Sequence, residues 1–364
     1  MDRLPRLLVL IGSGETAAQM SRGHRLIANR LAGEGRRVSD VRAAVIDTPY
    51  GFQSNADALT AGLVDFFGRR VGMATTVASL RRSDNDLLTR ETAFARIRES
   101  DFVFAGPGSP SYALRQWSGS PVSELFAHKL RAGGALVLAS AAALTIGRLT
   151  VPVYEIYKAG EDPYWLPGLD VLSTIGINAA VIPHYDNGEG GDHDTRFCFL
   201  GEQRLLALEE QMPVDVLILG IDEHTALIID LDAELATVAG RGSVTARRNG
   251  QSDVYAAGDE IPVQALRNAE PRPTSHRASE PPTPASDAAQ RLIAIERQLP
   301  ALSGRAGLVE PLIEAVLDVR RIARTNADFA TADAIRDRLL ALGIEIADSA
   351  DGRTDFHIRA PTRS

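Results

Sequence analysis

The sequence contains a single cysteine, Cys198, among its 364 residues. One thiol excludes an intramolecular disulfide and any zinc site built from several thiolates, so we expect a protein of the reducing cytoplasm. Long apolar runs are also lacking, since Gly12 and Gly14 end the first one far short of a membrane span. Nor does one sign of charge dominate: 39 basic residues face 47 acidic ones, and the formal net charge is −8. This balance argues against bulk attraction to nucleic acid or to a membrane surface.

Apolar residues, in contrast, make up 45% of the chain, which is enough to bury sizeable cores. Over the first two thirds, short apolar runs alternate with segments of helical periodicity, a pattern typical of an α/β fold with a mostly parallel sheet and flanking helices. After Asp230 the runs are short and alternating, with a turn signal at Asn249-Gly250, which predicts an antiparallel annex. The predicted strands are residues 7–11, 43–47, 102–105, 135–139, 179–182, 216–219 and 226–229, and the predicted helices are residues 56–69, 90–99, 122–131 and 195–211.

The composition changes near residue 263 and divides the chain into three parts. Residues 1–262 form the predicted α/β domain. Residues 263–289 are rich in Pro, Ser, Thr and Glu and are predicted to be a linker, because they hold few large apolar side chains. In residues 290–364 apolar residues recur at helical spacing, which predicts a small helical domain.

A glycine-rich segment, residues 12–17, follows the first predicted strand and has the spacing of a dinucleotide-binding fingerprint. Such a site needs an acidic residue at the end of the second strand, and Asp47 comes too late in the chain to fill that place. A tight strand-to-helix turn and a loop for another ligand remain open as alternatives.

A possible nucleophile follows the strand at residues 135–139. Ser140 stands at a predicted strand-to-helix turn and is followed by three alanines, and small neighbours allow the sharp turn that exposes a nucleophilic hydroxyl. A serine that only caps the helix is the alternative. His184, which follows the strand at 179–182, is the best-placed base, and Glu155 lies between the two in the sequence as a carboxylate that could orient the imidazole.

Four segments in this part of the chain carry a resemblance to a known family. They are Gly106-Pro107-Gly108, residues 139–143, residues 182–185 and residues 220–227. Together they resemble the peptidase S51 family, which includes aspartyl dipeptidases and cyanophycinases, on a fold similar to the class I glutamine amidotransferases. The resemblance covers roughly residues 5 to 240.

The resemblance implies a serine hydrolase that acts on a small peptide or amide substrate, with aspartyl compounds as the suggested class. Ser140 would be the nucleophile, His184 the base and Glu155 the triad acid. The amides of Gly106, Gly108 and Ala141 would hold the oxyanion, and Arg196 would contact the substrate. Glu223 is a further candidate for a substrate contact, with a charged turn at Asp222-Glu223 as the alternative.

Three positions around these residues depart from the family pattern. Leu138 and Ala142 stand where the family has glycines beside its serine, and a leucine there should crowd the turn. Pro107 has no N–H and so removes one candidate oxyanion donor. A ligand-binding protein of the same fold, weakened or inactive in catalysis, is therefore the alternative function.

The end of the chain resembles a second family. Residues 318–324, 328–337 and 342–352 look like the C-terminal end of cysteinyl-tRNA synthetases, although the catalytic domain of a synthetase is missing. Residues 291–364 hold 11 arginines and 11 acidic residues, so the basic surface typical of RNA binding is absent. Contact with a protein or with tRNA through this module remains a hypothesis.

A cluster of His184, Asp186 and residues 192–194 contains side chains that suit divalent metals. The glycines between them, at positions 188, 190 and 191, equally fit a solvated acidic loop. We expect no metal and no cofactor.

Overall fold

The computed structural model describes residues 3–267, six helical positions at 317, 320, 335, 336, 339 and 340, and two strands at 344–348 and 354–358. The chain divides into two compact units, residues 1–271 and 272–364. Among the described residues, no helix combines the length and the apolar character that crossing a bilayer requires.

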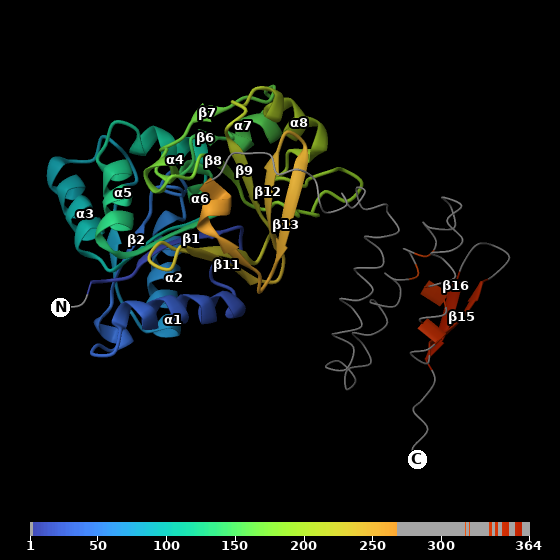
Figure 1. The fold of residues 1–364 in the computed structure, drawn as a ribbon, viewed down its shortest axis with the longest axis horizontal. Helices are drawn as coiled ribbons and strands as arrows, with labels where there is room; N and C mark the ends of the chain where they lie inside the picture. Colours follow the sequence, from blue (N-terminus) through green and yellow to red (C-terminus); the bar gives the residue numbers. More distant parts are fainter. Residues whose placement is uncertain are drawn as a thin grey trace, which may run out of the picture. The chain divides into compact units, whose positions relative to one another are not determined.

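The first unit is built on an eight-stranded sheet with β1 (Arg6–Ile11) near its centre (Figure 1). β1 runs parallel to β5 (Gly134–Ala139) on one side and antiparallel to β10 (Thr225–Asp230) on the other. The sheet is therefore parallel in one half and antiparallel in the other. Beyond β5 the parallel strands are β4 (Phe102–Ala105), β2 (Arg42–Ile46) and β3 (Ala74–Ala78); beyond β10 the antiparallel strands are β11 (Leu235–Gly240) and β14 (Glu260–Pro262).

Helices cover both faces of this sheet, because successive strand residues point to opposite sides. Leu7, Val9 and Ile11 pack on one side and Leu8 and Leu10 on the other. The first side is covered by α1 (Ala18–Ala32), α2 (Ala56–Asp65) and the π-helical turn η2 (Phe66–Val71); the second is covered by α3 (Leu87–Glu99), α4 (Pro110–Trp117) and α5 (Val122–Ala132) (Figure 1). A short turn, η1 (Val38–Asp40), precedes β2.

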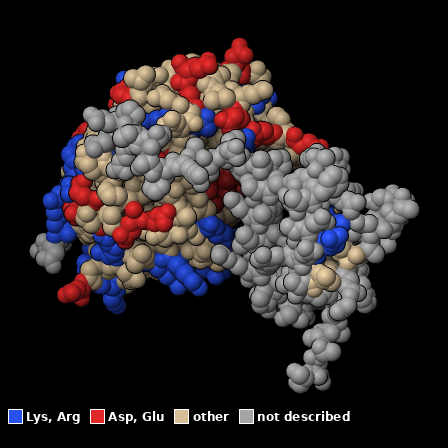
Figure 2. All heavy atoms as spheres, turned by 45° about the vertical axis from the view of Figure 1, so that its right-hand side comes forward, with Lys and Arg blue, Asp and Glu red and all other residues tan. Residues whose placement is uncertain are grey.

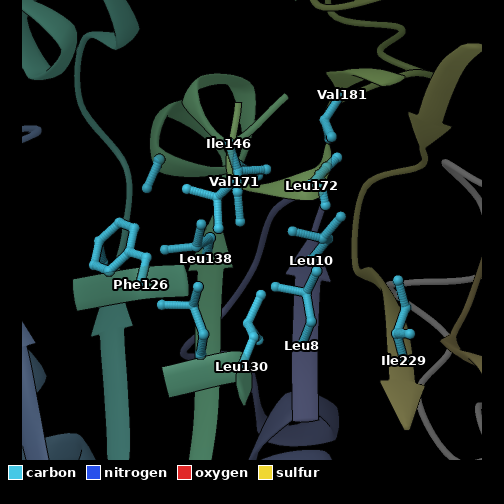
Figure 3. Packing of buried hydrophobic residues seen from close by; sticks show 14 of the residues in the cluster. Leu8, Leu10, Phe126, Leu130, Leu138, Ile146, Val171, Leu172, Val181 and Ile229 are labelled. Atoms are coloured by element: carbon cyan, nitrogen blue, oxygen red, sulfur yellow. The ribbon is translucent and has the colours of Figure 1, made fainter. Parts of the chain in front are cut away.

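A second sheet of six strands packs against the same core as β1 and β5. Val181 and Leu219 of this sheet share one apolar cluster with Leu8 and Leu138 of the first. Figure 3 shows Leu8 and Leu10 on β1 beside Leu138, with Ile146, Val171 and Leu172 nearby. The strand order is β13 (Gln251–Ala256), β12 (Ser243–Arg248), β9 (Leu217–Ile221), β8 (Ala179–Ile182), β6 (Leu149–Thr150) and β7 (Leu166–Pro167).

The outer face of the second sheet is covered by α7 (Val153–Tyr157) and α8 (Gly201–Glu210). Ile182 and Ile218 of the sheet pack there against these helices. The turn η3 (Leu172–Ile175) lies on the inner side, in the core shared by the two sheets.

The predicted α/β class is confirmed, but the prediction of one mostly parallel sheet is only partly right. The strands predicted at 179–182 and 216–219 belong to the second sheet, and half of the first sheet is antiparallel. The helix predicted at 195–211 begins only at Gly201, because the backbone of Phe197, Cys198 and Phe199 is left-handed.

The predicted boundary between the α/β domain and the linker also differs from the one that the structure shows. α9 (Val263–Arg267) occupies the first residues of the predicted linker, and its Val263 and Leu266 are buried in the core of the first unit. The remainder of the linker at 268–289 lies outside the described residues, as does most of the predicted helical domain at 290–364. In that domain the described strands β15 (Ile344–Asp348) and β16 (Thr354–Ile358) pair antiparallel, which the prediction of a helical module did not include.

The charges on the first unit are mixed in sign. On the face shown in Figure 2, many basic side chains lie along the lower and left edges and many acidic ones along the upper part, with further acidic side chains between them. This distribution agrees with the modest net charge of the chain.

Candidate active site

Ser140 lies on a sharp turn between β5 and α6 (Ala141–Thr145). Its backbone has φ 50° and ψ −118°, a conformation that is strained for any residue except glycine. The Ser140 amide donates to the carbonyl of Ile11 at the end of β1, 3.0 Å away, and this bond holds the turn against the sheet. The geometry is that of a nucleophile elbow.

Leu138 does not crowd this turn. Its side chain is fully buried and lies in the apolar core beside Leu10 and close to Ile146 and Val171 (Figure 3). Ala142 is also fully buried. The core therefore accommodates the two residues that replace glycine in the family pattern.

His184 connects Ser140 to a carboxylate. Ser140 Oγ lies 2.9 Å from His184 Nε2, and His184 Nδ1 lies 2.8 Å from Glu223 Oε1. Glu223 Oε1 also accepts a hydrogen bond from Asn187 Nδ2 at 3.1 Å, and the Glu223 amide donates to Asp186 Oδ1 at 2.7 Å. Serine, imidazole and carboxylate thus form one hydrogen-bonded chain.

The acid in this chain is not the one that we predicted. Glu155 lies on α7, where its Oε1 accepts from the Ser111 hydroxyl at 2.6 Å, and Ser111 Oγ lies 3.1 Å from Ser109 Oγ. The other oxygen of Glu155 is buried without a hydrogen-bond partner among the described residues. Glu155 therefore faces the start of α4 and not the imidazole.

Strand pairing explains why Glu223 takes the place expected for Glu155. β8 and β9 are parallel neighbours with Ile182 opposite Gly220, so the residues that follow them leave the sheet at the same edge. His184 follows β8 and Glu223 follows β9. Residues that directly follow two adjacent parallel strands lie close together, which explains the contact between His184 and Glu223.

Electrostatics favour an ionised Glu223. Burial by itself would raise its pKa, but hydrogen bonds from His184 and Asn187 and the nearby imidazoles of His184 and His224 lower the pKa below its ordinary value. The carboxylate therefore accepts the Nδ1 proton, which leaves Nε2 free to accept from the Ser140 hydroxyl. Asp222, one residue earlier, behaves differently, because burial and the charges of Asp186 and Glu223 raise its pKa to about 7.

The predicted oxyanion loop lies beside the elbow. The Ala142 amide donates to the carbonyl of Gly106 at 3.3 Å. Gly108 has φ +144°, and a Cβ at this position would lie 2.0 Å from the carbonyl oxygen of Pro49, so glycine is required. Within the part of the chain that the structure describes, neither the Gly108 amide nor the Ala141 amide donates to a protein acceptor.

A strained turn that the sequence did not predict supports His184. Phe197, Cys198 and Phe199 have φ values of 59°, 58° and 67°. The Cys198 amide donates to the carbonyl of His184 at 3.0 Å, and the Phe199 ring lies 6.3 Å from the imidazole. Burial, with the negative charge of Glu223, raises the pKa of Cys198 to about 12, so this residue stays a thiol and is no competing nucleophile at neutral pH.

The first glycine loop packs against the turn that carries Glu223. Gly14 has φ +67°, and a Cβ there would lie 2.1 Å from His224 Nδ1. The Ser13 hydroxyl accepts from the His224 amide at 3.3 Å. Of the alternatives left open by the sequence, a tight turn in close contact with the site agrees best with these distances.

The Arg196 guanidinium forms ion pairs with two carboxylates that are close to it in the sequence. Its Nε and Nη2 each lie 2.9 Å from an oxygen of Asp194, and Nη2 also approaches Glu202 at 3.6 Å. The structure thus groups Ser140, His184 and Glu223, whereas Arg196 and Glu155 are bonded elsewhere. In the range 3–267 and the other described positions, no group of three His, Cys, Asp or Glu side chains is placed to hold a metal ion.

A solved structure shares the fold of most of this chain. No family model matches the chain. A crystal structure of a peptidase from an acI-B1 Actinobacterium superposes with a TM-score of 0.56 at 19% identity, covering 71% of this chain and 98% of that one.

Sequence relatives match a different and much shorter part. The chain is 51% identical over 55 residues to cysteine–tRNA ligase of Paenarthrobacter aurescens, which is 15% of this chain and 11% of that protein. It is 56% identical over 45 residues to cysteine–tRNA ligase of Streptococcus pyogenes serotype M3, which is 12% of this chain and 10% of that protein. The chain thus spans about a tenth of the length of these relatives. The comparisons establish that most of the chain shares the fold of a solved peptidase and that a short segment is similar to cysteine–tRNA ligases.

Proposed function

We propose that the first unit is a serine hydrolase of the peptidase S51 type that cleaves an amide or peptide bond. The observation that carries this proposal is the hydrogen-bonded chain of Ser140, His184 and Glu223, with the serine on a strained turn. Three residues far apart in the sequence meet in the geometry that serine hydrolysis needs. The fold shared with a solved peptidase and the resemblance to the S51 family in four segments support the same conclusion.

In the first half of the reaction, Ser140 Oγ attacks the carbonyl carbon and its proton passes to His184 Nε2. Glu223 stabilises the imidazolium through Nδ1, 2.8 Å away. His184 then returns the proton to the leaving nitrogen as the C–N bond breaks, which leaves an ester on Ser140. In the second half, water attacks this ester, its proton passes through His184 back to Ser140, and the carboxylic acid leaves.

The amides of Gly108 and Ala141 are the donors for the negative charge that forms on the carbonyl oxygen. A preorganised donor of this kind typically contributes about 10² to 10³ in rate. Pro107, between Gly106 and Gly108, cannot donate, and this favours the second candidate function, which is a ligand-binding protein with little or no turnover. In that case the C-terminal module, with its similarity to cysteine–tRNA ligases, would dock on a protein or on tRNA.

Covalent labelling separates the two functions without knowledge of the substrate. We expect a fluorophosphonate probe to label the wild-type chain and Ser54→Ala, an exposed control serine, but neither Ser140→Ala nor His184→Ala. Mass spectrometry should place the adduct on Ser140. Wild-type protein that is neither labelled nor active on a panel of dipeptides would contradict the hydrolase, and equal labelling of Ser140→Ala would mean another nucleophile.

A further inference from the structure

A cavity of about 530 Å³ opens on the side of the first sheet that is covered by α1 and α2. This volume lies in the range of sites for small ligands. Its walls are mostly apolar and include Tyr50, Leu59, Leu63, Phe66 and Pro107. The elements that form it are the start of α1, the helix α2 with η2, and the loop after β4.

Two residues of the cavity lining, Pro107 and Glu15, are direct neighbours in the sequence of residues that belong to or contact the proposed site. Pro107 stands between Gly106 and Gly108, so the oxyanion loop forms part of its wall. Glu15 lines the cavity directly after Gly14, which touches the imidazole of His224 beside Glu223. A substrate attacked by Ser140 can therefore place a neighbouring group in this space.

Glu15 brings an acidic group to the end of the cavity next to the catalytic residues. Burial raises the pKa of Glu15 above its ordinary value, and its own backbone amide and the charges of His184 and His224 offset this only in part. No side chain among the described residues bonds to this carboxyl, although the Glu15 carbonyl accepts from His24 at 2.9 Å. Its free oxygens can accept from an ammonium group.

The basic residues near the cavity do not suit a short acidic side chain held at that end. Arg70 is outnumbered in the cavity lining by the acidic residues Glu15 and Asp65, so the charge of the lining does not favour a further carboxylate. Arg196, the residue expected to contact an aspartyl substrate, is paired with Asp194 and Glu202.

We infer that this cavity takes an apolar side chain next to the scissile bond while Glu15 holds the free amino group of the same residue. The site would then prefer peptides that begin with an apolar residue over aspartyl peptides. This inference rests on the proposed function, because it assumes that the substrate carbonyl lies at Ser140. Burial of a leucine-sized side chain and a charge-assisted hydrogen bond both favour such a ligand.

Equilibrium binding tests the inference independently of turnover. The full-length Ser140→Ala protein is titrated by calorimetry with Leu-Leu, N-acetyl-Leu-Leu and Asp-Leu. We expect Leu-Leu to bind at least about tenfold more tightly than either of the others. N-acetyl-Leu-Leu lacks the ammonium group for the charge-assisted hydrogen bond, and Asp-Leu lacks the apolar side chain that the cavity would bury. Equal or tighter binding of Asp-Leu, or no effect of the acetyl group, would overturn the inference.

Matched variants in the same background locate the effect. Glu15→Gln should weaken Leu-Leu binding by about tenfold and leave N-acetyl-Leu-Leu unchanged, while Glu34→Gln, an exposed control, changes neither. Ala58→Phe fills the cavity and should abolish the preference for Leu-Leu, whereas Ala61→Phe, exposed on the same helix and outside the cavity lining, should not. If Ala61→Phe and Ala58→Phe behave alike, the binding site lies elsewhere.

Turnover by the wild-type chain then separates the two proposals. Leu-Leu that binds with the stated preferences but is not cleaved contradicts the hydrolase and leaves the assignment of the cavity intact. Cleavage of Asp-Leu in preference to Leu-Leu supports the hydrolase and refutes the assignment of the cavity.

Discussion

The two sheets of the first unit supply different parts of the proposed active site. The first sheet presents Ser140 at the end of β5, a strand whose six residues are all buried. The second sheet presents His184 and Glu223 at the ends of β8 and β9, where the backbone is irregular. His184 itself has φ 49° and His224 has φ 54°.

The two sheets meet different requirements of the proposed site. The nucleophile stands on a tightly packed core, which fixes the position of its hydroxyl. The base and the acid stand on loops that follow the second sheet, where left-handed residues, like the strained backbone of Ser140 itself, must be held by surrounding contacts. The Ser140–His184 hydrogen bond therefore joins the two sheets, and substitutions on either sheet can test it separately.

The largest effect is expected from the acid on the second sheet. Glu223→Gln should lower the rate of Ser140 labelling by about 10² to 10⁴, because the imidazole loses the carboxylate that holds its tautomer. Glu155→Gln should lower it by less than about tenfold, since Glu155 bonds to Ser111 and not to His184. The measurement is the second-order rate constant with a fluorophosphonate. Equal losses in the two variants would contradict the assignment of Glu223.

The first sheet is tested by removing part of the core under the elbow. Leu138→Ala should lower the free energy of unfolding by about 2–5 kcal/mol, because it opens a cavity among fully buried side chains. Leu206→Ala, on the exposed face of α8, is the matched control and should change it by less than about 0.5 kcal/mol. Urea denaturation gives both values. A small effect at Leu138 would show that the nucleophile does not stand on a rigid core.

A pH-dependent effect is expected at the end of β9. The pKa of Asp222 is raised to about 7, so the folded chain holds this proton more tightly than the unfolded chain does. Its contribution to stability is complete below the ordinary pKa near 3.8 and is lost as the pH rises through 7. Asp222→Asn keeps an oxygen for the Ser243 amide and should gain stability over the wild type between pH 4 and 7, by at most about 1.4 kcal/mol per pH unit.

Thermal unfolding at pH 4, 6 and 8 measures this gain. The exposed control Asp162→Asn should show no such trend. A constant difference between Asp222→Asn and the wild type across this range would mean that Asp222 is ionised throughout.

The smallest effect concerns the link from α7 to the oxyanion loop. Ser111 joins Glu155 to Ser109, which follows Gly108 directly and caps the start of α4. Ser111→Ala should lower the labelling rate by about two- to fivefold and the free energy of unfolding by about 1–2 kcal/mol, since it leaves a buried carboxylate oxygen without its donor. If the labelling rate falls as far as in Glu223→Gln, the loop depends on α7 more than the contacts indicate.

Much of the fold could be predicted from the sequence, because apolar runs mark strands reliably. The strands predicted at 102–105 and 179–182 coincide with β4 and β8. The sequence could not show that these two strands lie in different sheets, since buried strands look alike in either one. β3, α1 and α4 were not predicted; β3 lies at the edge of its sheet and is only partly buried, so its apolar pattern is weak.

The site was predictable where it depends on local sequence and not where it depends on strand pairing. Ser140 and His184 follow apolar strands and carry small or polar neighbours, and the structure brings them together. Glu223 was expected to contact substrate, and Glu155 was chosen because it lies between the serine and the histidine in sequence. The missing information was that 179–182 and 216–219 are adjacent and parallel, which would have pointed to the acid after the second of them.

The position of β1 between β5 and β10 sets an order of events during synthesis. β1 is made first but pairs with strands that end at Ala139 and Asp230. At about 5–20 residues per second, the apolar residues of β1 wait roughly 10–40 s for β10 to emerge from the ribosome. During that time one edge of the central strand has no partner. Chaperones that shield apolar strands should therefore meet this chain early, and the activity that we propose should appear only after the codon for Asp230 has been read.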